Sequence, residues 1–274
     1  MKVSKKTKII LMILIVILIL KNITVSNKIQ FVQYNPNIQY KIPFILHQTW
    51  ISYETIPEQV KIIIEDNKKI CPEFEYRFYQ DEDCVKFIKD NFENNVLDAY
   101  NCINPEYSAA RADIFRYCVL YIYGGVYLDI KSKIKLDLKT IIDSNDECIL
   151  LEGDFYIRYI TELRLLNNFP MYEQWALIFK PGHPYLKECI DQIVINFNNR
   201  YIPSGNSKTK ILKLTGPELY SKSIHNYRKR NDYFHKDKIY NIFDIFDYSP
   251  IQHKKILYAN KKYYGSSENN LYNC

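Results

Sequence analysis

The chain has 274 residues, of which only 7 are glycine, whereas average usage would give about nineteen. No glycine-rich phosphate loop of the dehydrogenase, kinase or P-loop type can be written with these glycines, so those classes of nucleotide-binding protein are excluded. Five of the 37 basic residues and no acidic ones lie within residues 1–25, and the other 32 basic and 31 acidic side chains nearly cancel, so the net charge of +6 does not indicate a nucleic-acid partner.

The first predicted element is a membrane segment. Ile9–Leu20 is an unbroken run of aliphatic and methionine residues that four lysines precede. Its apolar character continues past Lys21, whose long side chain can reach the lipid headgroups, and no clear signal-peptidase site follows. We therefore predict an uncleaved signal anchor over residues 9–25 in preference to a cleaved signal peptide, with residues 1–8 in the cytoplasm and residues 26–41 as a stem.

The rest of the chain, residues 42–274, is predicted to form one domain on the lumenal or extracellular side of a single-pass type II membrane protein. Its seven cysteines are widely spaced and include no C-x-x-C motif, which excludes zinc-ribbon and thioredoxin-like sites. A lumenal location permits disulfides, although the spacing does not show which cysteines pair. Cys118 lies in an apolar helical stretch and is expected to be part of the core.

Strands and helices alternate along the first 130 residues. The apolar patterns predict strands over residues 42–50, 74–79, 126–130, 149–151, 175–179 and 240–246. Helices are predicted over residues 57–69, 81–94, 105–123, 184–199 and 217–227, with a polar loop over 203–210 and a solvated connection over 228–238. This alternation predicts an α/β fold with an open, mainly parallel sheet flanked by helices. Such sheets bind ligands beyond the carboxyl ends of their strands, which directs attention to Trp50, Asp81 and Asp129.

The densest group of candidate functional residues lies between residues 109 and 131. Asp113 and Arg116 are three residues apart and share one face of a helix. An isolated surface pair of this kind would stabilise the fold by only about 0–1 kcal/mol. Alanines surround the pair, however, as if a neighbour or ligand approaches closely. Gly124–Gly125 then allows a sharp turn into a strand that delivers Asp129 to the ligand-binding edge.

Five motifs in order resemble the glycosyltransferases that use nucleotide sugars and carry a DXD sugar-binding region, glycosyltransferase family 32. The motifs are Ile42–Trp50, Phe74–Asp81, Ala109–Lys131, Phe179–Pro184 and Thr215–Pro217. Within this family, the motifs resemble those of the yeast initiating mannosyltransferases and the bacterial capsular sugar transferases. The resemblance implies a GT-A fold and a retaining transfer of a hexose from a nucleoside-diphosphate sugar to a hydroxyl of a glycan, protein or lipid acceptor.

The resemblance also implies roles in donor binding. Trp50 would stack near the nucleotide base, and Asp113 would accept hydrogen bonds from hydroxyls of the donor sugar. Arg116 would contact the sugar or the phosphate, whose oxygens fit a guanidinium group. Asp129 would lie beside the ribose or the metal.

Lys131 departs from the family pattern. The family has Asp-x-Asp here, and its second aspartate binds Mn²⁺ or Mg²⁺, which offsets the charge that the nucleoside diphosphate gains as it leaves. Three alternatives stay open. Lys131 itself neutralises the diphosphate; Asp129 holds a cation together with Asp247 or His253; or the protein is a non-catalytic sugar- or nucleotide-binding membrane protein. We predict an active, membrane-anchored transferase ahead of this last alternative and ahead of a purely structural membrane protein.

Other candidate residues have simpler interpretations. His47 is expected to be a hydrogen-bonded core histidine, and His183 is expected to shape a turn. Glu152 and Asp154 follow a predicted strand and are either solvated or directed at the acceptor or donor sugar. No zincin or serine-hydrolase motif is present in the sequence.

Overall fold

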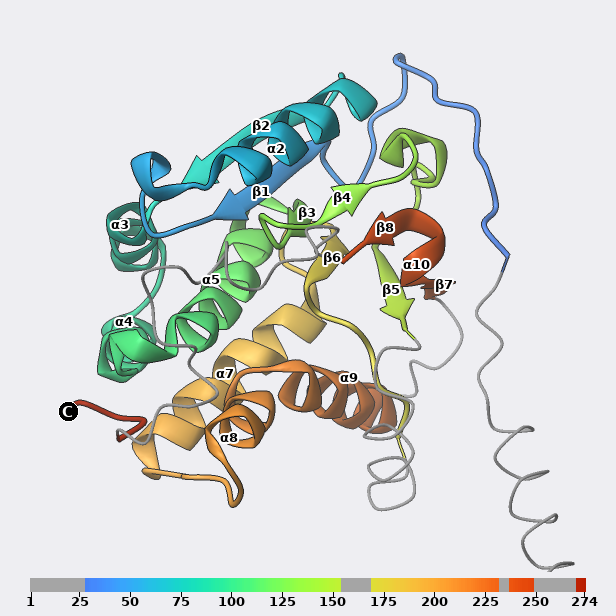
Figure 1. Ribbon diagram of the computed structural model, residues 1–274. Coiled ribbons are helices and arrows are strands. Elements are labelled where there is room, and N and C mark those ends of the chain that lie inside the picture. Colours follow the sequence, from blue (N-terminus) through green and yellow to red (C-terminus); the bar gives the residue numbers. More distant parts are fainter. Residues whose placement is uncertain (1–27, 154–168, 232–236, 249–269) are drawn as a thin grey trace, which may run out of the picture.

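The computed structural model describes residues 28–153, 169–231, 237–248 and 270–274 (Figure 1). The predicted cytoplasmic tail (residues 1–8) and membrane anchor (residues 9–25) lie outside the described residues. Within those four described ranges, none of the helices combines the length and the apolar character that crossing a membrane requires.

The core of the molecule is a six-stranded sheet with the order β2-β1-β3-β6-β5-β7. Its strands are β1 (Ile45–Thr49), β2 (Glu75–Tyr79), β3 (Gly125–Leu128), β5 (Cys148–Glu152), β6 (Ala176–Phe179) and β7 (Lys238–Asn241). The pairs β1–β2, β1–β3 and β5–β7 are parallel, and β6 is antiparallel to both of its neighbours. An open, mainly parallel sheet is therefore confirmed, with one strand reversed.

Alternating side chains of these strands enter two separate cores. On β3, Tyr127 packs into one cluster, whereas Val126 and Leu128 pack into the other. On the neighbouring strand β6, Leu177 packs into the same cluster as Tyr127, whereas Ala176 and Ile178 pack into the other cluster. Because both faces of the strands are buried, both must be covered by other elements, as is usual for a largely parallel sheet.

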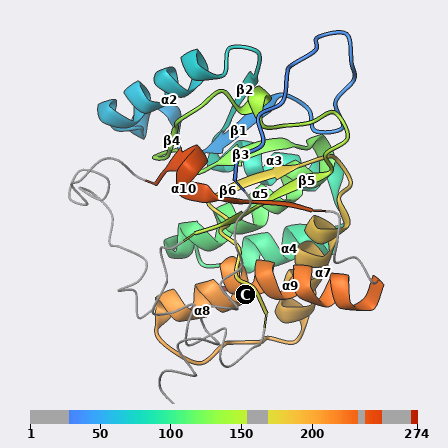
Figure 2. The same cartoon turned by 90° about the vertical axis from the view of Figure 1, so that its right-hand side faces the viewer.

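Helices cover both faces of the sheet (Figures 1 and 2). The larger cluster joins one face to α3 (Asp81–Asn91), α4 (Asn94–Cys102), α5 (Ser108–Tyr123), α7 (Pro184–Asn198), α8 (Ser207–Leu214) and α9 (Pro217–Asn231). The other face carries α2 (Glu58–Ile70), α10 (Ile242–Ile245) and a small antiparallel pair, β4 (Lys133–Ile134) with β8 (Phe246–Asp247). Figure 2 shows the sheet between α2 on one side and α7, α8 and α9 on the other.

Four predicted segments differ from the structure. The solvated connection predicted over 228–238 is wrong at its start, because α9 continues to Asn231 and Arg228 is buried against Asp237. The helix predicted over residues 81–94 ends at Asn91, and α4 begins separately at Asn94. The predicted loop over 203–210 contains the start of α8, because the Asn206 side chain accepts a hydrogen bond from Thr209 N at 2.9 Å and caps that helix. The strand predicted over 240–246 is broken by α10, whose first turn Asn241 caps in the same way.

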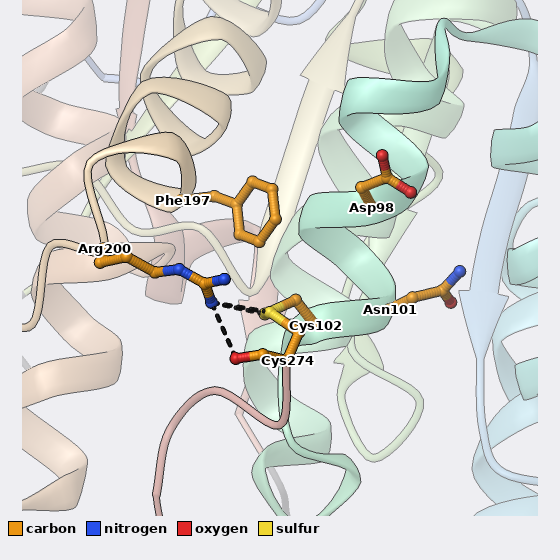
Figure 3. A pocket seen from close by; sticks show the side chains of 6 residues that line it. All are labelled: Asp98, Asn101, Cys102, Phe197, Arg200 and Cys274. Carbon is orange, nitrogen blue, oxygen red and sulfur yellow. Dashed lines mark hydrogen bonds between the residues drawn. A yellow bond between two sulfur atoms is a disulfide. The ribbon is translucent and has the colours of Figure 1, made fainter.

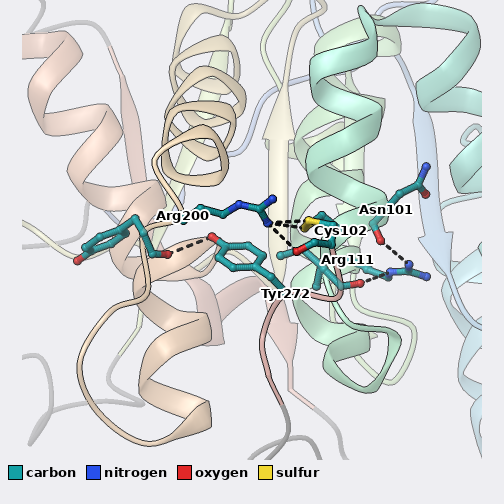
Figure 4. The surroundings of a disulfide bond; sticks show 8 residues. Asn101, Cys102, Arg111, Arg200 and Tyr272 are labelled. Atoms are coloured by element: carbon teal, nitrogen blue, oxygen red, sulfur yellow. Dashed lines mark hydrogen bonds between the residues drawn. A yellow bond between two sulfur atoms is a disulfide. The ribbon is translucent and has the colours of Figure 1, made fainter.

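A disulfide joins α4 to the segment 270–274, between Cys102 and Cys274 (Figure 4). The two Cα atoms are 5.2 Å apart and the residues are 172 positions apart in sequence. Asn104 N donates to Leu271 O at 2.9 Å, and Leu271 is buried in the larger core. Arg200 donates to the Cys274 carbonyl oxygen at 3.0 Å (Figure 3). The segment is therefore held by backbone pairing, a buried leucine and a covalent bond.

The other five cysteines are free and buried, Cys118 among them, as expected for a core residue.

Candidate functional site

The carboxyl ends of β1, β3 and β5 meet at one edge of the sheet. β6 is antiparallel to β3 and β5, so its amino end lies at this same edge. Asp129 N donates to Trp175 O at 2.8 Å, which extends the pairing one step beyond the strands. The residues immediately before β6 thus share this edge with the residues that follow β3.

Two glycines place β3 in this position. α5 ends at Gly124, which has φ of 64°, and a Cβ at this residue would lie 2.6 Å from Pro181 Cδ. Gly125 has φ of 94°, and its Cβ would lie 2.6 Å from the Ile45 carbonyl oxygen of β1. Left-handed backbone and close contact both require glycine here. The paired glycines therefore turn the chain from the helix that carries Asp113 directly into the strand that leads to Asp129.

Asp113, Arg116 and Asp129 form a charge cluster at this edge. Arg116 Nη2 lies 3.0 Å from Asp129 Oδ1 and 3.2 Å from Asp113 Oδ1. Arg116 Nη1 donates to the Gln174 carbonyl oxygen at 2.8 Å, and the guanidinium lies 4.7 Å from the centre of the Tyr127 ring. The structure thus joins three sequence-predicted residues from a helix and a strand end.

Asp113 is held by neutral donors as well. Its Oδ1 accepts from Gln174 Nε2 at 2.8 Å, and its Oδ2 accepts from Thr215 Oγ1 at 2.9 Å. Burial raises the pKa of Asp113 to about 6, while Arg116 and these donors act in the opposite direction. The carboxyl is therefore predominantly ionised at neutral pH, as a partner for Arg116 must be.

The cluster is buried except for one member. The side chains of Asp113 and Arg116 are 4% and 5% exposed, so the two are not the solvated surface pair that their spacing alone allowed. The Asp129 side chain is 23% exposed. Asp129 is consequently the carboxylate that faces outward, and Arg116 and Asp113 lie behind it.

Trp50 packs against the residue that follows Asp129, and Lys131 lies two residues after Asp129. The half-buried Trp50 ring packs with Val60 of α2 and with Ile130, next to Asp129. Lys131 Nζ lies 4.8 Å from the centre of the Tyr248 ring. An aromatic ring and a lysine therefore adjoin the segment that carries the exposed carboxylate.

The turn after β3 is fixed by one buried asparagine of α2. Asn67 Nδ2 donates to the Ser132 carbonyl oxygen at 2.9 Å, and Asn67 Oδ1 accepts from Ile134 N at 2.8 Å. Asn67 is fully buried. Its side chain thus forms the backbone hydrogen bonds that a neighbouring strand would otherwise supply to the turn that carries Lys131.

The described residues do not fit a divalent cation at Asp129. Asp129 is already in an ion pair with Arg116, and Lys131 occupies the position of the second family aspartate. Asp247 is 51% exposed in its side chain, follows Phe246 on β8 and lies 3.9 Å from Lys135. Among the residues described, no group of three or more His, Cys, Asp or Glu side chains could hold a metal. His253, the other candidate ligand, lies outside the described part of the chain.

Gln174 and Thr215 were missed as site residues by the sequence reasoning. Gln174 is 61 positions from Asp113 and precedes a predicted strand without any motif to mark it. Thr215 belongs to the Thr-Gly-Pro motif, which is part of the family resemblance. The signal that could have found it is its hydroxyl, a donor that a buried carboxylate such as Asp113 needs. Tyr117 connects the two, since its hydroxyl donates to Gln174 Oε1 and lies 2.8 Å from the Thr215 carbonyl oxygen.

The minor candidates are also located. His47 lies in the core, with Nε2 2.9 Å from the Gly124 carbonyl oxygen and Nδ1 3.1 Å from the Tyr79 hydroxyl, as predicted. His183 caps α7 by accepting from Tyr185 N at 3.3 Å, which confirms its role in a turn. Glu152 is the last residue of β5 and is buried, so it is not a solvated loop acid; Asp154 lies outside the described residues.

Comparison with known proteins connects this geometry to one family. The family model described as "Glycosyltransferase sugar-binding region containing DXD motif" matches residues 57–147. A protein named "Uncharacterized glycosyltransferase L373", from Acanthamoeba polyphaga mimivirus, is 31% identical over 191 residues, which are 69% of this chain and 67% of that protein.

Two fungal proteins are also similar. "Mannosyl phosphorylinositol ceramide synthase SUR1" of Saccharomyces cerevisiae is 36% identical over 209 residues, 75% of this chain and 48% of that protein. "Inositol phosphoceramide mannosyltransferase 2" of Schizosaccharomyces pombe is 28% identical over 191 residues, 69% of this chain and 48% of that protein. The chain thus spans about half the length of these fungal relatives.

One solved structure, "PaToxG Glycosyltransferase", shares the fold with a TM-score of 0.53 at 16% identity, over 70% of this chain and 72% of that one.

Proposed function

This chain belongs to the glycosyltransferases whose sugar-binding region contains a DXD motif, and on that premise we propose that it transfers a hexose from a nucleoside-diphosphate sugar to an acceptor hydroxyl. The observation that carries the proposal is the Asp113–Arg116–Asp129 cluster at the ligand-binding edge of the sheet. The two fungal relatives have "mannosyl" or "mannosyltransferase" in their names, so mannose is the first hexose to test, with a glycan, protein or lipid as acceptor.

The proposed donor site consists of Trp50, Asp113, Arg116, Asp129 and Lys131. Trp50 offers a half-buried aromatic face on which a nucleotide base can stack. Asp129 would accept hydrogen bonds from the ribose or the sugar through its exposed edge. Asp113 and Arg116 would contact the sugar from behind Asp129 and hold that carboxylate in place.

We further propose that Lys131 does what a metal does in relatives that carry Asp-x-Asp. The leaving nucleoside diphosphate gains negative charge in the transition state, and a positioned cation stabilises it. Lys131 stands at the position of the second aspartate and has an aromatic ring, Tyr248, beneath it. This assignment makes turnover independent of added metal.

Retention of configuration and attachment to a membrane complete the proposal. Retention follows from the family resemblance, and attachment follows from the apolar run Ile9–Leu20. The Cys102–Cys274 disulfide supports a lumenal or extracellular domain, because disulfides persist in oxidising compartments.

The test is incubation of the full chain in detergent with a panel of nucleotide sugars, with and without EDTA. We expect donor hydrolysis or transfer with at least one sugar in both conditions. Lys131→Ala should lower kcat in EDTA by about 10²–10³-fold, the loss typical of removing one group that stabilises transition-state charge. Lys187→Ala, which removes a surface lysine paired with Asp191, is the matched control and should leave kcat unchanged.

Turnover that EDTA abolishes would contradict the role of Lys131 and favour a bound cation. No turnover with any donor in either condition would overturn the proposed function.

A non-catalytic sugar- or nucleotide-binding protein is the second candidate, and the lysine at position 131 is the observation that favours it. This alternative predicts that calorimetry detects binding of the donor while no donor is turned over. The Asp129→Ala variant should then differ from the unaltered protein only in its affinity for the donor.

A further inference from the structure

One stretch of the chain carries cations and no acids. Residues 192–217 include Arg200, Lys208, Lys210 and Lys213 but neither aspartate nor glutamate. The stretch covers the end of α7, the connection to α8 and the whole of α8. Figure 1 shows this connection at the lower end of the described chain. Positive charge is therefore concentrated at one end of a molecule whose charges otherwise nearly cancel.

The same stretch exposes large apolar side chains. Ile195, Tyr201 and Ile202 are 50%, 47% and 55% exposed. Tyr201 N donates to the Asn196 carbonyl oxygen at 2.9 Å, which turns the chain back toward the part of α7 that carries Ile195. Single exposed apolar side chains are ordinary, but a group of them indicates an interaction surface.

α8 carries two lysines on one side and core residues on another. Lys210 and Lys213 are three residues apart, so they share a face of the helix, and both are partly exposed. Ile211 and Leu214 are buried in the larger core. Neither lysine forms an ion pair with a residue that the structure describes. We call the group Ile195, Tyr201, Ile202, Lys210 and Lys213 the basic-apolar surface.

The connection between α7 and α8 is held in one conformation. Arg200 has φ of 49°, the one positive φ of a non-glycine residue within the described ranges. Its guanidinium donates to the Cys274 carbonyl oxygen at 3.0 Å, and the Tyr272 hydroxyl donates to the Tyr201 carbonyl oxygen at 3.0 Å (Figure 4). A surface fixed in this way loses little conformational entropy when it binds.

α8 leads from this surface to the proposed donor site. Lys213 lies two residues before Thr215, whose hydroxyl donates to Asp113 Oδ2 at 2.9 Å. The helix has 8 residues and is therefore about 12 Å long. The basic-apolar surface and the charge cluster are thus connected by one short helix.

Resting on the membrane attachment in the proposed function, we propose that the basic-apolar surface docks the folded domain onto a membrane that carries anionic lipids. Lys210 and Lys213 face the anionic headgroups, the two isoleucines enter the interface, and Tyr201 lies at headgroup level. An acidic protein would also attract the lysines. Cations combined with exposed aliphatic side chains are typical of segments that lie on a bilayer, however, and an attached domain is already beside one.

The test uses the full chain reconstituted in phosphatidylcholine vesicles with and without about 30% phosphatidylserine. A fluorescent probe is attached to Ile202→Cys without reductant, and quenching of the probe by spin-labelled lipid reports contact with the bilayer. Ile62→Cys is the matched control, because Ile62 lies on α2, across the sheet from α8, and is 57% exposed. We expect strong quenching at position 202 in the anionic vesicles, weaker quenching in the neutral ones, and none at position 62.

The charge dependence gives a second measurement. In the anionic vesicles, the double variant Lys210→Gln, Lys213→Gln should lower the ratio of docked to undocked domains about 10-fold. High salt should weaken quenching in the unaltered lysine background, because it screens charges at the membrane surface. The salt measurement needs no variant of α8.

Flotation of the same samples separates this inference from the proposed anchor. A chain that floats with the vesicles, but whose probe at position 202 is quenched no more than the probe at position 62, would overturn docking, and the surface would then fit an acidic protein. Quenching that is equal in neutral and anionic vesicles at every salt concentration would also overturn it. A chain that floats only with anionic vesicles would support docking and contradict the anchor. No donor is used, so sugar transfer stands or fails separately.

Discussion

At the scale of single residues, two buried carboxyls near the ligand-binding edge of the sheet, Asp113 and Glu173, differ in their neighbours. Asp113 accepts from Arg116, Gln174 and Thr215, and these donors favour its charged form. Glu173 has the Trp175 side chain as its hydrogen-bond partner, so burial sets its behaviour. Burial raises the pKa of both carboxyls, and the donors around Asp113 oppose this rise more strongly than the one hydrogen bond from Trp175 does at Glu173.

Glu173 makes the stability of the fold depend on pH. Its pKa is about 7 in the folded protein against an ordinary value of 4.5, so the folded state holds the proton more tightly than the unfolded state. Stability is therefore lost as pH rises from about 4.5 to 7. We expect Glu173→Gln to be more stable than the unaltered protein by about 3 kcal/mol at pH 8 and by under about 1 kcal/mol at pH 5. Urea unfolding at the two pH values measures the difference.

Glu147→Gln should show the opposite sign, because Lys180 and Lys41 lower the pKa of Glu147 to about 2 and stabilise its charged form. An equal effect of Glu173→Gln at both pH values would contradict the assigned titration of Glu173.

At the scale of elements, the parts predicted from sequence are those whose signal is local. α5 and its end at Gly124 follow from an apolar periodic run and a glycine pair. α4 and α8 were not predicted. α4 begins at Asn94 without a side-chain cap to mark it, whereas α8 begins where the Asn206 side chain caps it. The strand predicted over 240–246 fails for a similar reason, because the Asn241 cap outweighs the β propensity of the residues that follow.

Two glycines with positive φ differ in how strongly their positions require glycine, since Gly124 also has ψ of −162°, a conformation that other residues rarely adopt. Gly124 and Gly182 have the same φ of 64°, but a Cβ at Gly124 would meet Pro181 at 2.6 Å, whereas a Cβ at Gly182 would meet nothing within 4 Å. We expect Gly182→Ala to cost about 1 kcal/mol, the strain of a left-handed alanine alone. Gly124→Ala should cost clearly more, about 3 kcal/mol, since the clash adds to the strain.

Thermal or urea unfolding of the two variants measures this difference. Equal losses would show that the α5–β3 turn has room to relax, and would remove the packing argument for glycine at position 124.

At the scale of the whole molecule, the site depends on contacts between distant parts of the sequence. Trp50, Asp113, Arg116, Asp129 and Lys131 were predicted to share one edge from strand order and family resemblance, and the structure joins Asp113, Arg116 and Asp129 directly. The segment before β6 could not be predicted to join them. Nothing in its sequence shows that β6 is reversed, and only the reversal brings its amino end to the carboxyl ends of β3 and β5.

The disulfide is the other long-range feature, and it gives a prediction for the whole chain. Reduction should lower stability by about 2–4 kcal/mol, because Cys102 and Cys274 close a long loop. The thermal midpoint of the unaltered protein should fall with dithiothreitol. The double variant Cys102→Ser, Cys274→Ser should start at the lower value and show no further change.

Alkylation gives an independent readout. The five free cysteines are buried, and burial raises the thiol pKa of Cys71 and of Cys84 to about 12. Iodoacetamide should therefore label the exposed Cys274 and at most Cys102 besides in the folded, reduced protein, and all seven thiols once the protein is unfolded. Labelling of more than two thiols in the folded protein would contradict the burial of the free cysteines.

The side chain of Asn67 has a mechanical consequence. It bonds the turn that carries Lys131 to α2, and the same helix packs on Trp50 through Val60. With the donor bound as proposed, α2 would therefore connect the ring that stacks on the base with the lysine that faces the diphosphate. A nucleoside that tilts α2 would shift Lys131, and by linkage a diphosphate held at Lys131 would improve binding of the base by the same factor. The two ends of the donor would then be recognised jointly, so that neither fragment alone reports the affinity of the whole.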